Sequence, residues 1–194
     1  MTKRSARLTP VPSPAVTDAG RRTREALLDA GVAVAEEEGL TGLSVNRVVA
    51  RAGVAKGTFY VHFEDREAFV DALHQRFHER VTEAVKTATE GKPLGAERIW
   101  AGAEAYLDVC LADRAVKALA LEARSDPGLS SSMSKRHERF AASAIPSFKA
   151  IGWQDAAAAS QLVAAMTAEI AIRELEAGRR LPSARRALHR FLSA

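Results

Sequence analysis

Residues 44–63 contain many side chains that can donate hydrogen bonds, and not one carboxylate. Such groups can all donate to the oxygens of an anion, and the phosphates of a nucleic acid are anions of this kind. Residues 1–24 are also basic, with Asp18 as their only acid. Positive charge distributed this unevenly suits a nucleic-acid partner, although a solvated helix surface would explain Arg47 and Arg51 equally well. The donors of residues 44–63 include Ser44, Arg47, Arg51, Lys56, Thr58, Tyr60 and His62.

Other chemistry has little support in the sequence. His74 and His78 are four residues apart, a spacing that can share a metal ion on a helix, but no acid or cysteine completes an obvious third ligand locally. Cys110 is the only cysteine, which excludes an intrachain disulfide. We find no phosphate-cradling glycine loop, nucleophile elbow or His-Glu metalloprotease motif. We therefore expect a protein that is not an enzyme and that uses no metal or cofactor.

The bulk composition predicts a globular protein in the cytoplasm. Of the 194 residues, 47% are hydrophobic and 27% are charged, and the net charge is +4. No uncharged apolar run reaches the roughly 20 residues that span a bilayer, so we expect no membrane partner. Residues 9–14 interrupt the basic N-terminus with prolines, where a signal peptide would need an apolar core.

The N-terminal residues predict an arm followed by a helix. Residues 1–20 combine three prolines with small and basic residues, which predicts a disordered basic arm. The apolar spacing predicts a first helix over about residues 21–38. Gly39 is a natural stop, since glycine readily takes the left-handed conformation that closes a helix.

Three further helices are predicted before residue 90. Ser44 is a good N-cap for a short helix that ends at Gly53, and its valines form one apolar stripe. A third short helix follows over about residues 55–61. Asp65 can cap a fourth, longer helix that continues to about Thr89.

After residue 90, the spacing of apolar residues also predicts helices. Groups of residues containing glycine and proline separate the predicted segments. Pro146 should kink or divide the segment 130–150. No stretch alternates apolar and polar residues as a strand would, so the chain is predicted to be all-α. The predicted segments are 95–124, 130–150, 154–177 and 183–192.

Two short helices joined by a tight glycine turn are the geometry of a helix-turn-helix, whose second helix enters the major groove of DNA. From Ser44 to Phe69 the sequence reads SVNRVVARAGVAKGTFYVHFEDREAF. This stretch, together with the helix that ends at Gly39 before it, closely resembles the DNA-binding signature of the TetR family of bacterial transcription regulators. The resemblance covers roughly residues 20–75, and beyond it the family is defined by architecture rather than by sequence.

The resemblance implies DNA contacts at the start of each helix. Ser44 would bind a phosphate through its hydroxyl or through the free amides of its helix N-terminus. Lys56, Gly57 and Thr58 would open the recognition helix, where Gly57 permits close approach and its neighbours reach base edges or phosphates. Arg47 joins these candidates as a basic residue of the preceding helix.

Further contacts to the DNA backbone are implied beyond the start of the recognition helix. Tyr60 and His62 would hydrogen-bond to phosphates, and Arg66, where the family usually has lysine, would contact another phosphate. The chain departs from the family pattern at two positions. Val61 replaces a frequent tyrosine, and Val49 replaces a smaller alanine, which makes the operator sequence less transferable from relatives.

The resemblance also implies an architecture. A three-helix helix-turn-helix domain, residues 21–66, would be joined by the long fourth helix to a C-terminal helical domain, residues 67–194, for ligand sensing and dimerisation. Alanine-rich residues 154–177 would allow close helix approach in a homodimer, or would simply complete the core of one chain. The candidate dimer contacts are Leu162, Ile170, Leu188 and Phe191.

Residues large enough to line a cavity are the candidate effector contacts, and core packing is the alternative for each of them. Glu169 is added because it shares an apolar face with Leu162 and Met166, where a carboxylate needs a partner. That partner could be Arg173, the dimer mate or a cationic ligand. The candidate effector contacts are Trp100, Tyr106, Cys110, Phe140, Met166 and Glu169.

These features together predict a ligand-responsive repressor. A dimer would bind a pseudo-palindromic double-stranded operator and would be released by a small, apolar effector of unknown identity. Two alternatives remain open at this level. The C-terminal domain could answer to a protein partner, or the chain could be a helical adaptor whose helix-turn-helix is vestigial.

Overall fold

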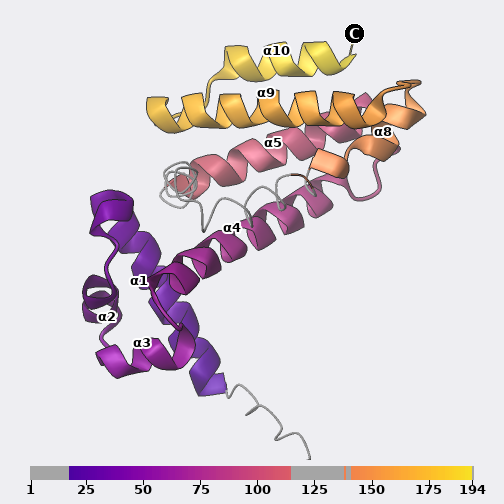
Figure 1. The fold of residues 1–194 in the computed structure, drawn as a ribbon. Coiled ribbons are helices and arrows are strands. Elements are labelled where there is room, and N and C mark those ends of the chain that lie inside the picture. Colours follow the sequence, from indigo (N-terminus) through magenta and orange to yellow (C-terminus); the bar gives the residue numbers. More distant parts are fainter. Residues whose placement is uncertain (1–17, 115–137, 139–140, 194) are drawn as a thin grey trace, which may run out of the picture.

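The computed structural model describes residues 18–114, 138 and 141–193, and its described elements are all helices (Figure 1). The all-α prediction is thereby confirmed. Most of the predicted arm and residues 115–137 lie outside the described residues. The helices are α1 (Asp18–Gly42), α2 (Val45–Ala52), α3 (Lys56–His62), α4 (Arg66–Thr89), α5 (Ala96–Ala112), α8 (Ile145–Ala150), α9 (Ala156–Ala177) and α10 (Pro182–Ser193).

Helix α1 begins earlier and ends later than the sequence predicted. It starts at Asp18 rather than at residue 21, and its last residue is Gly42. Gly39 nevertheless breaks the helical path, since its backbone has φ 67° and ψ −168°, a conformation that only glycine adopts at little cost. The predicted stop at Gly39 is therefore a kink.

The predicted caps of the short helices are confirmed. The Ser44 side chain accepts a hydrogen bond from the backbone amide of Arg47 at the start of α2. Gly53 ends α2 in the left-handed conformation, with φ 67° and ψ 31°. Oδ1 of Asp65 accepts a 2.8 Å hydrogen bond from the amide of Ala68, so Asp65 caps α4.

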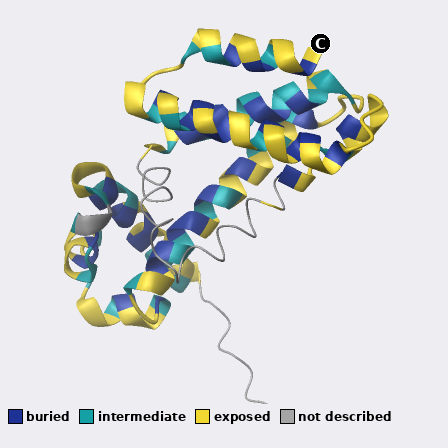
Figure 2. Ribbon diagram, turned by 45° about the horizontal axis from the view of Figure 1, so that its top comes forward, coloured by how far each residue is buried: buried dark blue, intermediate teal, exposed yellow. Residues whose placement is uncertain are grey.

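The described residues form two hydrophobic cores that share helix α4. The N-terminal core joins α1, α2 and α3 to residues 69–73 of α4, whereas Phe77 and Val81 of the same helix belong to the C-terminal core. Figure 2 shows the buried face of α4 passing from one group of helices to the other. The packing thus changes between Leu73 and Phe77, and not at residue 66, where the sequence prediction placed the domain boundary.

Close approach of α1 and α4 depends on Gly31. A Cβ atom at Gly31 would lie 2.5 Å from Cζ of Phe69, which is too close for any real side chain. The missing side chain lets the Phe69 ring occupy the space between the two helices. The helix-turn-helix is therefore fixed firmly onto the N-terminal end of α4.

In the C-terminal part, α5, α9 and α10 pack against one another, and a network of ion pairs joins the three helices (Figure 1). Glu174 of α9, with 1% of its surface exposed, accepts two hydrogen bonds from the guanidinium of Arg185 in α10, at 2.7 and 2.6 Å. Arg185 also donates to Asp108 of α5 at 2.6 Å, and Asp108 accepts a second bond from Arg180. The amide of Leu181 completes the partners of Glu174.

Burial alone would raise the pKa of Glu174. The hydrogen bonds from Arg185 and the Leu181 amide, with the charges of Arg185 and Arg180, outweigh burial and hold the pKa of Glu174 below its usual range. The hydrogen bond to Glu174 conversely raises the pKa of Arg185. Both groups are therefore charged, and their mutual bonding offsets the cost of removing them from water.

No helix in the described ranges has both the length and the apolar character needed to cross a membrane.

Candidate nucleic-acid interface and effector cavity

Helix α3 separates an apolar inner face from a polar outer face. Phe59 is fully buried, and its ring packs against those of Phe63 and Phe69 with centroids 5.3 and 5.2 Å away. Tyr60, one residue further along, has 50% of its surface exposed. The aromatic cluster holds the inner face of α3 against the core and leaves its outer face open to a partner.

The outer face of α3 carries the residues that the sequence singled out. Lys56 and Gly57 are exposed at its first turn, and Thr58 and His62 are half-buried beside them. Lys56 forms no ion pair with any of the described residues. A Cβ atom at Gly57 would meet no heavy atom within 4 Å. This face can therefore approach a polyanion closely without first breaking contacts within the chain.

Arg47 and Arg51 are placed differently from the donors of α3. The guanidinium of Arg47 is paired with Glu38, and that of Arg51 donates to both carboxylate oxygens of Glu37 at 2.7 and 2.9 Å. Both pairs tie α2 to α1. Carboxylates this close oppose the approach of a phosphate, so the arginines of α2 are weaker candidates for DNA contact than Lys56.

Ser44 and Arg66 have structural partners as well. Ser44 uses its oxygen as the N-cap of α2, which leaves its hydroxyl hydrogen able to donate. Nε of Arg66 donates a 2.7 Å hydrogen bond to the carbonyl oxygen of Leu43. Arg66 thereby joins the start of α4 to the segment before α2, and a phosphate contact from its remaining amino groups stays a prediction.

Residues 27–73, which contain α2, α3 and the first turns of α4, match the family model described as bacterial regulatory proteins, tetR family. These residues form a DNA-binding domain of the TetR family. The matched residues coincide with the N-terminal core and with the first part of α4. The resemblance noted in the sequence is thereby confirmed.

Curated relatives match this chain over part of its length. The HTH-type transcriptional regulator YvdT of Bacillus subtilis is 30% identical over 84 residues, covering 43% of this chain and 41% of YvdT. The HTH-type transcriptional repressor NemR of Escherichia coli is 36% identical over 69 residues, covering 34% of this chain and 35% of NemR. The matched stretches thus span about two fifths or less of these relatives. Their names agree with a DNA-binding regulator rather than an enzyme.

Solved structures extend the likeness to the C-terminal helices. A transcriptional regulator of Rhodococcus sp. RHA1 superposes with a TM-score of 0.77 at 21% identity, covering 88% of this chain and 94% of that one. A TerR/AcrR-family regulator of Aquifex aeolicus gives a TM-score of 0.73 at 20% identity, over 88% of this chain and 98% of its own. These structures share the fold over 88% of this chain.

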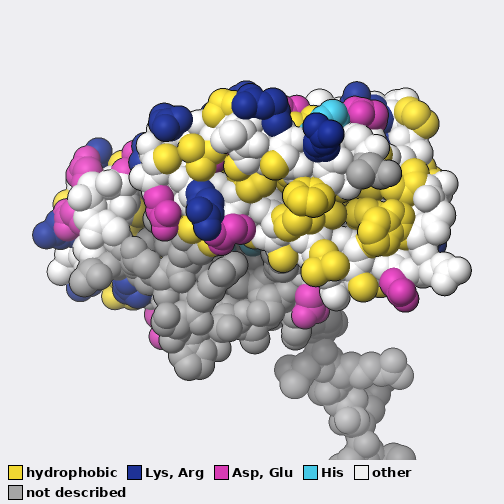
Figure 3. Space-filling view, turned by 90° about the horizontal axis from the view of Figure 1, so that it is seen from above, with side chains coloured by type: hydrophobic (Ala, Val, Ile, Leu, Met, Phe, Trp, Pro, Cys, Tyr) yellow, Lys and Arg dark blue, Asp and Glu magenta, His cyan; other side chains and the backbone are white. Residues whose placement is uncertain are grey.

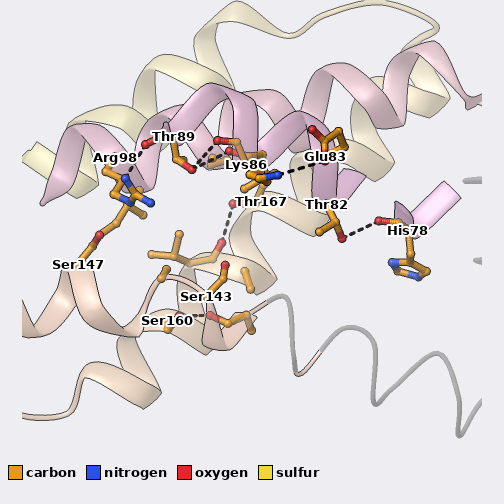
Figure 4. Close-up of a pocket in the computed structure, with 18 of the residues that line it drawn as sticks. His78, Thr82, Glu83, Lys86, Thr89, Arg98, Ser143, Ser147, Ser160 and Thr167 are labelled. Atoms are coloured by element: carbon orange, nitrogen blue, oxygen red, sulfur yellow. Dashed lines mark hydrogen bonds and ion pairs between the residues drawn. The ribbon is translucent and has the colours of Figure 1, made fainter. Parts of the chain in front are cut away.

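The chain contains a cavity of about 870 Å³ between α4, α5, α8 and α9 (Figure 4). Small residues make room for it on three of the helices, as at Gly102 of α5, Ala144 near α8 and Ala164 of α9. Hydroxyl groups are frequent in its wall. They belong to Thr82, Thr89, Ser143, Ser147, Ser160 and Thr167.

None of the predicted effector contacts that the structure describes lines this cavity. Tyr106 and Cys110 are buried in the C-terminal core, and Trp100 packs its ring 4.9 Å from that of His189. Met166 is exposed. Phe140 lies outside the described residues. Large side chains fill the core, whereas a cavity forms where side chains are small.

Glu169 is not a cavity residue either. It is exposed, and its carboxylate accepts a 2.8 Å hydrogen bond from Nε of Arg173. This is the arginine partner named among the alternatives. The buried carboxylate of α9 is Glu174, which the sequence analysis missed.

The candidate dimer contacts divide into two groups. Leu162 of α9 and Phe191 of α10 have 64% and 71% of their surfaces exposed, whereas Ile170 and Leu188 are buried in the core of the chain. Figure 3 shows hydrophobic side chains gathered on the outer face of α9 and α10. The prediction is therefore corrected for Ile170 and Leu188, which the chain itself covers.

The two histidines that could share a metal ion, His74 and His78, lie in different surroundings. His74 is buried at the junction of the two cores, and His78 lies at the cavity wall (Figure 4). No cluster of three metal-ligating side chains occurs in the described part of the chain.

Proposed function

We propose that this chain is a repressor that binds a pseudo-palindromic operator as a homodimer and is released by a small molecule bound in the α4–α9 cavity. The observation that carries the proposal is the exposed polar face of α3, inside the segment that matches the family. The curated names of NemR and of DhaR, from a Mycobacterium species, both include the word repressor. Binding to chromosomal DNA would place the protein in the cytoplasm.

Helix α4 would carry the signal from the cavity to the DNA. Its N-terminal turns belong to the core of the helix-turn-helix, and much of the cavity wall comes from its C-terminal half. A helix of 24 residues is about 36 Å long, and a tilt of about 5° at one end moves the other by about 3 Å. An effector acts on this equilibrium only if it binds one tilt more tightly than the other. The α4 residues of the wall are Gln75, His78, Glu79, Thr82, Glu83, Val85, Lys86 and Thr89.

The proposed function is tested by selecting bound sequences from a random double-stranded DNA pool with the full chain. A repressor of this kind should enrich a pseudo-palindrome whose half-sites lie about one helical turn apart, or a multiple of it. Recovery of no enriched sequence by a folded dimer would instead favour control by a protein partner or a vestigial helix-turn-helix.

Replacing single donors on α3 should separate backbone contacts from base contacts. Tyr60→Phe and His62→Ala are each expected to weaken operator binding about 10-fold on every sequence, because each removes one hydrogen bond to a charged phosphate. Lys56→Ala should weaken binding and also relax base preference. Fluorescence anisotropy with operator and scrambled duplexes measures both effects, and unchanged binding in all three variants would remove α3 from the interface.

The exposed apolar face of α9 and α10 is the proposed dimer contact. The double variant Leu162→Glu, Phe191→Glu is expected to be monomeric at micromolar concentration, because buried carboxylates without partners are costly in an apolar interface. Sedimentation velocity gives the mass. Leu94→Glu, an exposed apolar residue outside α9 and α10, is the matched control and should stay dimeric. A dimeric double variant would place the interface elsewhere.

A further inference from the structure

Charged side chains line the cavity at both ends. Glu83 lies 3.9 Å from Lys86 on the side of His78, and Arg98 lies at the other end, near Ser147 (Figure 4). Glu79 also belongs to the wall. Both glutamates are exposed to water, whereas Arg98 is half-buried. A charge that is partly removed from water interacts more strongly with a ligand than a fully solvated one does. Arg98 is therefore the stronger electrostatic feature of the wall.

The guanidinium of Arg98 has hydrogen-bond capacity left for a ligand. Its Nη1 donates to the carbonyl oxygens of Thr89 and Lys92, the second at 2.8 Å. No carboxylate of the described residues pairs with it, so its charge meets only carbonyl dipoles. A guanidinium has five N–H groups, and the planar fork that they form suits the two oxygens of an anionic group.

Ser147 supplies a second donor at the same end. Its side chain is buried, with 3% of its surface exposed, yet its hydroxyl makes no hydrogen bond to the described residues. Helices α5 and α8 meet where a Cβ atom at Gly95 would lie 3.7 Å from Cγ2 of Ile151. Arg98 and Ser147 are each about one helical turn from that contact, along their own helices.

Part of the wall beyond this donor pair is apolar. Ile99 and Ala103 of α5 face it from one side, and Val163 and Ala164 of α9 from another. An ion without an apolar part would leave this surface in contact with water, and a wholly apolar ligand would leave Arg98 and Ser147 unpaired. The lining fits a molecule that has both an anionic group and an apolar body.

We propose that the cavity binds an amphipathic organic anion, with a carboxylate or phosphate held by Arg98 and Ser147 and an apolar body along α5 and α9. This inference rests on the proposed function and names the chemical class of its effector. It adds an anionic head group to the small, largely apolar effector that the sequence predicted. Arg98 also gives the ligand a route to the DNA-binding part, because an anion would compete for Arg98 with the carbonyl oxygen of Thr89, the last residue of α4.

Four ligands with one decyl chain and different head groups test the proposal. Sodium decanoate, decyl phosphate, decan-1-ol and decylamine are titrated calorimetrically into the full chain below micelle-forming concentrations. Decanoate, decyl phosphate or both should bind about 10- to 100-fold more tightly than decan-1-ol, the difference expected for hydrogen bonds to a charged group. Whichever anion binds more tightly identifies the head group.

Variants of the donor pair assign the preference to this end of the cavity. Arg98→Gln should bind the anions and the alcohol equally, and Arg98→Lys should retain part of the preference. Since Arg98 also caps the end of α4, Ser147→Ala provides a second variant that leaves that cap intact, and it should reduce anion affinity several-fold. Arg186→Gln, at an exposed arginine of α10, is the matched control and should behave as the wild type.

Three results would overturn the proposal: equal affinity for decan-1-ol and the anions, tightest binding of decylamine, or no binding of any of the four. Operator binding by the ligand-free dimer is measured separately with the selected DNA. A chain that binds its operator but shows no anion preference would therefore refute the effector class alone, whereas failure to bind any DNA would refute the proposed function.

Discussion

Glu174→Gln is expected to reduce the free energy of unfolding by about 3–5 kcal/mol, the usual cost of removing one partner from a buried ion pair. The variant keeps the shape of the side chain but leaves the buried guanidinium of Arg185 with Asp108 as its remaining carboxylate partner. The pair joins α9 to α10, so its loss loosens the helices that carry the proposed dimer face. Urea unfolding followed by circular dichroism measures the change.

The same helix offers a matched control for this prediction. Glu169→Gln removes a carboxylate of the same type from an exposed pair with Arg173, four residues apart on α9. Exposed pairs of this kind contribute about 0.3–0.5 kcal/mol. Equal losses in the two variants would show that burial of the Glu174–Arg185 pair does not govern its contribution.

The pH dependence of stability should follow from the lowered pKa of Glu174. A carboxyl group whose pKa is lower in the folded state stabilises the fold above its unfolded pKa, and this contribution is lost as the pH falls through the folded value. The wild type should therefore lose stability below the ordinary pH range of glutamate titration. Glu174→Gln, which cannot titrate at this position, should show a shallower loss over the same range.

Gly57→Leu is expected to leave the fold intact and to weaken operator binding by about 100-fold, as expected when two contacts of 1–3 kcal/mol each are lost. Gly57 is exposed at the first turn of α3, and the space around its absent side chain contains no heavy atom within 4 Å. A leucine side chain therefore fits in the free protein. In the complex it would stand between α3 and the DNA and would displace Lys56 and Thr58 from the groove.

Two measurements separate the effect on DNA from an effect on folding. Gly57→Ala should slightly raise the melting temperature, since glycine within a helix is less favourable than alanine by about 0.5–1 kcal/mol. Ala177→Leu, at an exposed position near the end of α9, adds the same side chain on another surface and should bind the operator normally. Undiminished affinity of Gly57→Leu would mean that the first turn of α3 does not enter the groove.

The helix-turn-helix could be predicted from the sequence because its signals are local. Ser44, Gly53 and Asp65 each determine the backbone within a few residues of themselves, through a cap or a left-handed turn. The buried position of Phe59 and the exposed position of Tyr60 follow from the helical period of a short segment. No distant contact is needed for any of these inferences.

The cavity could not be predicted in the same way, because it depends on which residues of four helices face one another. Large side chains were expected in its wall, but Tyr106 and Cys110 turn into the core. Gly102 and Ala164 line the empty space instead. A single sequence gives no sign of which small residues face one another across a gap.

Helix α9 shows why the sequence indicates a buried carboxylate at Glu169, whereas the buried one is Glu174, more than one helical turn later. Alanines occur all around this helix, so the apolar stripe through Leu162 and Met166 is no more hydrophobic than the one through Val163 and Ile170. Packing of α5 and α10 decides between them, and it buries the second stripe, which continues to Glu174. Arg185, on the buried face of α10 with Leu188, was the available signal for a partner.

Helix α4 determines where hybrid regulators can be joined. A cut at residue 66 would separate Phe69, Val70 and Leu73 from the core that they complete, and would leave the transplanted helix-turn-helix with an open apolar surface. A junction between Leu73 and Phe77 would carry the whole N-terminal core and keep α4 continuous into a foreign C-terminal part. The portable unit of this protein therefore ends in the middle of a helix, and fusions that respect the helical register there should retain the operator preference of the donor.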